Sequence, residues 1–232
     1  MKPKFCSVII PVHNDFDHIE FAINSVKTQE LSSFQYKIIV IDDGSRLEDF
    51  KKFKEKFDNY TDIQIIRSFE NKGPAYARNI GLEIADTEYI AFLDSDDRWP
   101  SSRGKLLDLI WDDSCDAVWG MSEYEIDPSI DYEFQNGEIV FKNVMGCLSY
   151  KKNEKTKDLR FDQDMRFGED TDFYLMLNES GARIKKLKHT IMIRNIHGSN
   201  MTIVEKHDER KVSLKVFKNR MKRISLNKNE YD

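Results

Sequence analysis

The chain has 232 residues, of which 40% are apolar and 33% are charged, and its formal net charge is −5. This length suits one α/β domain with a sizeable core. The acidic balance argues against non-specific nucleic-acid binding by the chain as a whole.

Three scattered cysteines, Cys6, Cys115 and Cys147, lack metal-ligand spacing. We expect them to be reduced and buried, as in a cytoplasmic protein. The first apolar run is too short for a signal peptide, and no segment reaches the length of a transmembrane helix. The sequence therefore predicts a cytoplasmic protein, in which any membrane contact would be peripheral.

Strands and helices alternate through the first half of the chain. Short apolar runs predict strands at Ser7–Val12, Lys37–Ile41, Ile63–Ile66 and Tyr89–Leu93. Apolar residues at helical spacing predict helices at Asp15–Lys27, around Phe50–Phe57 and at Pro74–Ala85. This alternation predicts an α/β fold with a Rossmann-like, mostly parallel sheet flanked by helices. In such sheets, ligands bind beyond the carboxyl ends of the strands.

The second half is less regular. Helices are expected near Leu106–Trp111 and at Glu169–Asn178, and a strand at Ala117–Gly120. Residues 151–158 are polar and Lys-rich, which indicates a mobile loop. From residue 205 the chain is basic, with Leu214, Phe217, Met221 and Ile224 on one helical face.

An acidic cluster, Asp94-Ser95-Asp96-Asp97, follows the fourth predicted strand. Clustered carboxylates repel one another unless a cation offsets their charge. Mg²⁺ or Mn²⁺ is the natural partner, because these ions prefer oxygen ligands and leave coordination sites for phosphate. The alternative is a solvated turn whose aspartates cap a helix. The position at a strand end favours a metal site.

Several segments in register resemble the family 2 glycosyltransferases of the GT-A fold. They are Val8–Asn14, Ile39–Ser45, Asn71–Pro74, Ala77–Gly81, Phe92–Asp97, Leu159–Asp162 and Phe167–Phe173. The resemblance covers roughly residues 5–203. It implies a GT-A domain at 1–204, with a nucleotide-binding half at 1–98 and an acceptor-side half at 99–204. A basic amphipathic helical tail at 205–232 would follow.

The resemblance also implies a nucleotide-sugar pocket, with a UDP-sugar as the expected donor. Its residues would be Pro11, Val12, His13, Asn14, Asp15, Asp42, Asp43, Asn71, Gly73, Arg78, Asn79, Asp94 and Ser95. Asp43, in preference to Asp42, would accept a hydrogen bond from uracil, and an Asx-turn is the alternative. Arg78 and Asn79 would lie near the base or the diphosphate, where the Arg fork suits phosphate. An exposed helix residue is the alternative for Arg78.

The resemblance further assigns the chemistry of transfer. Asp96, Asp94 and His197 would bind Mn²⁺ or Mg²⁺, although a purely structural role is the alternative for His197. Asp170 would be the general base that deprotonates the acceptor hydroxyl, giving inversion in a single displacement. Capping of the following helix by Glu169 and Asp170 is the alternative. Glu169 and Trp99 are expected on the acceptor side.

The expected function is therefore metal-assisted, hexosyltransferase-type transfer to a glycan or other hydroxyl acceptor in polysaccharide biosynthesis. One rival is a nucleotidyltransferase, which would usually have a Gly-rich basic loop where this chain has Pro11–Asp15. The other is a non-catalytic module that binds nucleotide sugars. The basic tail has two interpretations: a helix docked on the domain with solvated Lys and Arg, or a peripheral contact with anionic lipid or a polyanionic acceptor.

Overall fold

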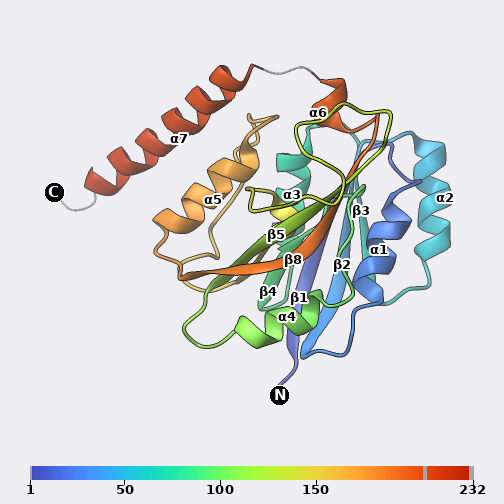
Figure 1. Cartoon of the computed structure of the whole chain (residues 1–232), viewed down its shortest axis with the longest axis horizontal. Helices are drawn as coiled ribbons and strands as arrows, with labels where there is room; N and C mark the ends of the chain where they lie inside the picture. Colours follow the sequence, from blue (N-terminus) through green and yellow to red (C-terminus); the bar gives the residue numbers. More distant parts are fainter. Residues whose placement is uncertain (1, 206–207, 230–232) are drawn as a thin grey trace.

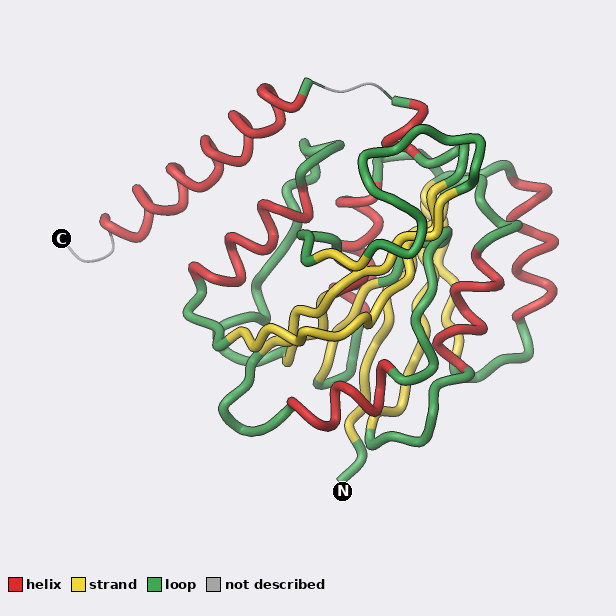
Figure 2. Tube along the Cα trace, viewed as in Figure 1, coloured by secondary structure: helices red, strands yellow, loops and turns green. Residues whose placement is uncertain are grey.

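The computed structural model describes residues 2–205 and 208–229, which form one eight-stranded sheet with helices on both faces (Figure 1). The strands are β1 (Lys4–Val12), β2 (Phe34–Asp43), β3 (Ile63–Ser68), β4 (Tyr89–Phe92), β5 (Ala117–Ile126), β6 (Ile139–Val140), β7 (Leu148–Lys151) and β8 (Ile184–Ile196). The helices are α1 (Ile19–Lys27), α2 (Leu47–Phe57), α3 (Pro74–Ile84), α4 (Arg103–Ile110), α5 (Glu169–Glu179), α6 (Met201–Val204) and α7 (Glu209–Asn229), with a 3₁₀ turn, η1, at Met145–Cys147. Figure 2 shows the strands as one layer between the helices.

The amino-terminal strands form the parallel part of the sheet. The strand order is β3-β2-β1-β4-β7-β5-β6, and β8 pairs with β5. β1 runs parallel to β2 and β4, and β2 runs parallel to β3, which confirms the predicted parallel arrangement. β7 is antiparallel to both β4 and β5. The sequence did not predict β8, because its many Lys residues interrupt the apolar run that marks a buried strand.

Strand β1 shows how one apolar run serves two layers. Val8, Ile10 and Val12 belong to the core cluster that includes residues of α1, α2 and α4. Ile9 belongs to the cluster that includes residues of α3 and α5. The residues divide between the two clusters because neighbouring residues of a strand point to opposite faces of a sheet. All four side chains are buried. Each face of the parallel sheet is therefore covered, as a continuous apolar run requires.

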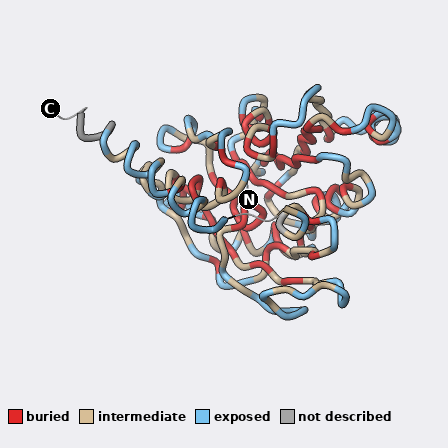
Figure 3. Tube along the Cα trace, turned by 90° about the horizontal axis from the view of Figure 1, so that it is seen from above, coloured by how far each residue is buried: buried red, intermediate tan, exposed pale blue. Residues whose placement is uncertain are grey.

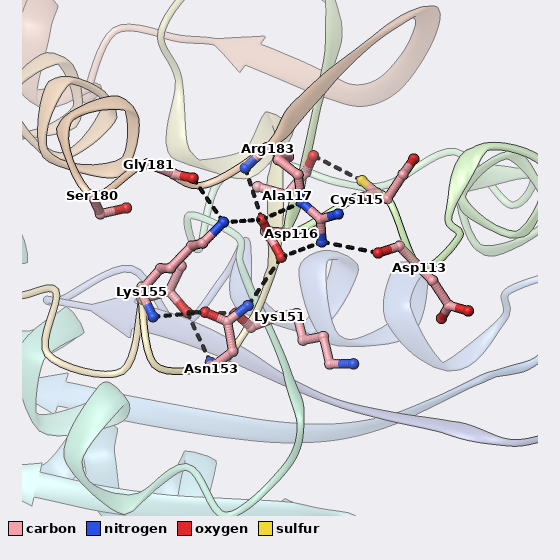
Figure 4. A network of polar contacts seen from close by, with 12 residues as sticks. Asp113, Cys115, Asp116, Ala117, Lys151, Asn153, Lys155, Ser180, Gly181 and Arg183 are labelled. Atoms are coloured by element: carbon pink, nitrogen blue, oxygen red, sulfur yellow. Dashed lines mark hydrogen bonds and ion pairs between the residues drawn. The ribbon is translucent and has the colours of Figure 1, made fainter.

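The segment 151–158 is tied to the sheet, so the expectation of a mobile loop is wrong (Figure 4). The carboxylate of Asp116, at the amino end of β5, is buried. It accepts hydrogen bonds from Asn153 Nδ2 at 3.1 Å and from Arg183 Nε at 2.9 Å, and lies 3.3 Å from Lys155 Nζ. Lys155 Nζ also donates to the carbonyl of Gly181 at 2.9 Å. A polar loop is ordered here because a distant carboxylate binds its side chains.

Replacing Asp116 with asparagine is expected to lower the free energy of unfolding by about 2 kcal/mol at pH 7, the scale of a lost charged hydrogen bond. Hydrogen bonds from Arg183 are the main reason why the pKa of Asp116 lies far below its usual range. A depressed pKa stabilises the fold above pH ~4, and this contribution is lost as the carboxylate protonates at lower pH. The difference between Asp116→Asn and wild type should therefore shrink when urea unfolding is measured at pH 3. The exposed neighbour gives the control, since Asp113→Asn should unfold like wild type. Equal losses in both variants would contradict this account.

Helix α7 lies at one edge of the molecule, beside α5 (Figure 1). The predicted tail also includes residues 206–207 and 230–232, which lie outside the described residues. None of the helices in the described ranges combines the length and the apolar character that crossing a bilayer requires. Cys6, Cys115 and Cys147 are free and buried, as predicted.

Candidate active site

Polar side chains meet where β1, β2 and β4 end, because parallel strands present their carboxyl ends at one edge of the sheet. His13 follows β1, and its Nδ1 lies 2.8 Å from the backbone oxygen of Asp43, the last residue of β2. Ser95 follows β4, and its Oγ donates to Asp15 Oδ2 at 2.8 Å. The three loops are thus joined directly by hydrogen bonds.

Asn14 and Asp42 shape the loops around this edge. Asn14 has a φ of 54°, a left-handed conformation that asparagine adopts more readily than most residues. Its N–H donates to Ser45 Oγ at 2.8 Å, and its Oδ1 accepts from the N–H of Arg46 at 2.9 Å. Asp42 is buried, accepts from the N–H of Ser45 at 3.0 Å and lies 3.4 Å from Arg67 Nη1. Asp42 therefore stabilises the turn that follows β2.

Asp43 connects the end of β2 to the start of α3. Its carboxylate accepts hydrogen bonds from the N–H groups of Lys72 at 3.0 Å and Gly73 at 2.7 Å. Burial raises the pKa of Asp43, and these two hydrogen bonds oppose the rise. Gly44 has a φ of 72°, and a Cβ there would lie 2.6 Å from the nitrogen of Asn71. Only glycine allows this approach, which brings the exposed Asn71 to the edge of the site.

Arg78 of α3 joins three carboxylates from two distant segments of the chain, the loop after β4 and the start of α5. Its side chain is 4% exposed, so it is not the exposed helix residue of the alternative interpretation. Nη2 donates to Asp94 Oδ1 at 2.7 Å. Nη1 donates to Glu169 Oε1 at 2.9 Å and to Asp170 Oδ1 at 3.2 Å. One guanidinium cannot neutralise three carboxylates, so the cluster favours an additional cation.

Asp170 differs from its neighbour Glu169 in exposure and pairing. The side chain of Asp170 is 20% exposed, and that of Glu169 is 9% exposed. The second oxygen of Asp170, Oδ2, accepts from the N–H of Met145 at 3.2 Å. Burial raises the pKa of Asp170 to about 8 against the opposing charge of Arg78, and the charges of Glu169 and Asp94 add to the rise. A carboxylate whose pKa lies near neutrality suits general-base chemistry.

Asp96 lies beside His197, which follows β8. Asn200 Nδ2 donates to Asp96 Oδ2 at 2.6 Å, and His197 Nε2 lies 3.4 Å from the same oxygen. Burial opposes ionisation of Asp96, but the interactions with His197 and Asn200 outweigh it and lower the pKa of Asp96. The His197 ring stacks on that of His18, with ring centroids 4.5 Å apart. These contacts bring an oxygen donor and a nitrogen donor together.

The donor groups at this edge have the chemistry that a divalent cation requires. Within residues 2–205 and 208–229, no three side chains of His, Cys, Asp or Glu are already gathered as a metal cage. The side chains of Asp94 and Asp96 are 30% and 23% exposed, and the buried Nε2 of His197 has Asp96 Oδ2 as its neighbour at 3.4 Å. Mg²⁺ and Mn²⁺ often take only one or two carboxylates and complete their shell with water and phosphate. The residues present supply such a partial shell.

Four of the expected site residues, three from the nucleotide-sugar pocket and one from the acceptor side, face the protein interior. Asn79 Nδ2 donates to the carbonyl of Phe161 at 2.9 Å, and its Oδ1 accepts from the N–H of Phe161 at 2.8 Å. Asn79 thus holds the segment before α5 against α3. Trp99 is 3% exposed and belongs to the core cluster of α1 and α4, away from an acceptor surface. Pro11 and Val12 are the last, buried residues of β1.

Two contacts of the site were not predicted from sequence. Met145 acts through its backbone N–H, for which its side chain gives no signal. The sequence does carry a signal for Asn200, which stands three residues after His197 and at the N-cap position of α6, where polar residues are favoured. Asp97, the third aspartate of the acidic cluster, is buried and accepts from the N–H of Asn195 at 2.9 Å. It therefore faces β8.

Polar loops at the carboxyl ends of parallel strands and a carboxylate with a raised pKa are the features of an α/β enzyme's active site. Comparison with known proteins gives the family. The model for glycosyl transferase family 2 matches residues 7–175. The chain belongs to glycosyltransferase family 2.

Relatives and solved structures agree with this assignment. Minor teichoic acid biosynthesis protein GgaA of Bacillus subtilis (strain 168) is 30% identical over 197 residues, which cover 75% of this chain and 43% of GgaA. S. aureus TarS 1-349 in complex with UDP-GlcNAc has a TM-score of 0.67 at 20% identity, over 90% of this chain and 62% of that chain. Mannosyltransferase PcManGT from Pyrobaculum calidifontis, in complex with GDP-Man and Mn²⁺, has a TM-score of 0.58 at 18% identity, over 84% of this chain and 57% of that chain. These two likenesses show the GT-A fold, and the chain spans less than half the length of GgaA.

Proposed function

We propose that this chain transfers a hexose-type sugar from a UDP-sugar to a hydroxyl of a cell-surface polysaccharide, with inversion. The observation that carries the proposal is the position of Arg78, which contacts Asp94 of the acidic cluster and Asp170 at the start of α5. The donor end and the acceptor end of the reaction thus share one buried cation. The UDP-GlcNAc complex of TarS supports the choice of donor, and the name of GgaA supports a teichoic acid or a similar polymer as acceptor.

The loop after β1 and the β2–α3 junction would hold the nucleotide. His13, Asn14 and Asp15 lie beside the junction that Asp43 forms with Lys72 and Gly73. Asp43 has lone pairs beyond those hydrogen bonds and would accept from the uracil edge. Asn71 and Ser95 would contribute polar contacts from the neighbouring loops, as the family resemblance implies.

Asp94, Asp96 and His197 would hold Mn²⁺ or Mg²⁺. When bound, the ion offsets the charge that develops on the departing diphosphate. Arg78 fixes the orientation of Asp94 through one oxygen and leaves its other oxygen for the ion. Asn200 does the same for Asp96 through Oδ2.

Asp170 would take the proton of the acceptor hydroxyl as that oxygen attacks the anomeric carbon, and the sugar–phosphate bond breaks on the opposite face. Its hydrogen bonds from Arg78 and Met145 fix the carboxylate in position. Glu169 would support it from the acceptor side by sharing Arg78. Positioning of this kind contributes much of the rate enhancement in such transfers.

The pH dependence of kcat/KM is expected to follow the ionisation of Asp170. The pKa of Asp170 is raised to about 8, so the fraction of ionised base increases between pH 6 and pH 9. Initial rates at low donor concentration and saturating Mn²⁺ should therefore rise through this range and level off only above about pH 9. A rate that stays flat from pH 6 to pH 9 would exclude Asp170 as a base with a raised pKa.

Release of UDP tests the proposed function against its two rivals. A panel of UDP-sugars, incubated with Mn²⁺ and a teichoic acid acceptor, should yield UDP together with a glycosylated polymer. A binding module would bind the same donors without releasing UDP. A nucleotidyltransferase would produce pyrophosphate from UTP and a sugar phosphate. The division into a nucleotide-binding half at 1–98 and an acceptor-side half at 99–204 remains part of this proposal.

A further inference from the structure

Helix α7 is attached to the domain through one of its faces. Val216 is 9% exposed and lies next to Gly168, the residue before α5. Asn219 Nδ2 donates to Asp162 Oδ2 at 2.7 Å. Arg223 donates through Nε to Glu179 at 2.7 Å, and its Nη1 donates to Asp172. The spacing of three and four residues places these attachments on one side of α7.

The opposite side of α7 carries an exposed apolar row. Leu214, Phe217 and Met221 are 51%, 58% and 44% exposed. Leu214 and Phe217 each stand two residues from an attached residue, Val216 and Asn219 respectively. This separation corresponds to about 200° around the helix. The row therefore faces outward along the edge of the molecule, where Figure 3 shows exposed and half-buried positions along α7. Helix α7 is docked on the domain, as the first interpretation of the tail expects, and this docking leaves the apolar row exposed.

A strip of lysines runs beside the apolar row. Lys211, Lys218 and Lys222 are exposed, and their spacing of seven and four residues puts them on one strip of the helix. The structure of residues 2–205 and 208–229 gives none of them an ion pair. Nearer the attached face, Lys215 pairs with Asp162 and Arg220 with Glu179. The uncompensated positive charge is thus concentrated on the outward side.

We propose that this outward face of α7 docks on an anionic lipid bilayer. The face comprises Lys211, Leu214, Phe217, Lys218, Met221 and Lys222. An apolar row bordered by lysines matches a helix that lies in the plane of a membrane, with aromatic and aliphatic side chains in the acyl boundary. The lysines select the anionic surface, because each basic residue near such a membrane strengthens binding about fivefold. A straight outer row on a single helix also fits a flat surface.

Vesicle sedimentation of the full chain tests the proposal. The probe is a set of vesicles of phosphatidylcholine with equal parts of phosphatidylglycerol, compared with phosphatidylcholine alone, at 50 mM and 500 mM salt. The wild-type chain should bind the anionic vesicles at low salt, and high salt should weaken the binding. The triple variant Lys211→Gln/Lys218→Gln/Lys222→Gln should bind about a hundredfold more weakly, since three factors of about five multiply. Phe217→Ser should also weaken binding, since it removes the most exposed apolar side chain of the row.

A matched control separates this face from general charge. Lys51→Gln/Lys52→Gln/Lys54→Gln removes the same charge from exposed positions of α2 and should bind like wild type. Thermal unfolding of every variant checks that the fold is kept. Equal binding to neutral vesicles, or an equal loss in the α2 control, would overturn the proposal. A dimer in sedimentation equilibrium that Phe217→Ser abolishes would also overturn it, because a second copy of the chain would then cover the row.

Discussion

Replacing Asp170 with asparagine is expected to reduce sugar transfer at least about a hundredfold, the scale of a lost general base. An amide has nearly the same shape as the carboxylate but does not take up the acceptor proton. Arg78 would keep its hydrogen bonds to Asp94 and Glu169, so the site should stay assembled. Single-turnover transfer at pH 8 measures the loss directly. Asp164→Asn, an exposed change six residues earlier in the chain, should transfer like wild type.

The same variant makes an opposite prediction for stability. The pKa of Asp170 is raised in the folded state, so its contribution favours folding below pH ~4 and is lost as pH rises through about 8. Asp170→Asn should therefore gain stability relative to wild type between pH 5 and pH 9, as measured by thermal unfolding. Near-full transfer by Asp170→Asn, or a fold that is lost at every pH, would show that this carboxylate is structural.

The second large effect is expected at Asp96. Asp96→Asn should lower transfer by at least about a hundredfold at low Mn²⁺, because an amide is a far weaker ligand than a carboxylate for a hard cation. His197 and Asn200 lie beside this position and would remain. Transfer rates across a Mn²⁺ titration should show that the variant needs a much higher metal concentration.

The adjacent aspartate supplies the control. Asp97 is buried against Asn195, and burial raises its pKa well above the usual range, with the charge of Asp96 adding to the rise. Asp97→Asn replaces a carboxyl group held toward its neutral form, so its Mn²⁺ dependence should match that of wild type. If Asp97→Asn abolished the metal dependence and Asp96→Asn preserved it, the assignment of the ligands would be reversed.

The sequence predicts the parallel half of the fold well, because each of its strands is a short, continuous apolar run between helical patterns. β1 and β2 are longer than predicted. Polar residues at their amino ends, Lys4 in β1 and Gln35 and Lys37 in β2, break the apolar runs from which the strands were predicted. The second half was harder to predict. β8 is rich in lysine, and β7 is only four residues long, so neither gives the apolar run that identifies a buried strand.

For the site, the strand-end positions of Asp43 and Asp94 indicated that their loops would meet. The hydrogen-bond partners of these side chains could not be predicted from the sequence, because the partners lie far away along the chain. Arg78 reaches Glu169 across 91 residues of sequence, and Asn79 reaches Phe161 across 82. Adjacent residues of α3 therefore have different structural roles: Arg78 binds the carboxylates, whereas Asn79 binds the backbone before α5. These roles follow from how α3 packs against that segment, which the sequence does not reveal.

The central claim is that Asp94 and Asp96 hold a divalent cation that binds the diphosphate of a sugar nucleotide. Calorimetric titration of UDP into the wild-type chain and into Asp96→Asn, each with Mn²⁺ and with EDTA, tests it most directly. We expect UDP to bind the wild-type chain at least about tenfold more tightly with Mn²⁺ than with EDTA, and we expect this difference to vanish in Asp96→Asn. Equal binding with and without Mn²⁺, or a variant that keeps the full metal effect, would contradict the claim.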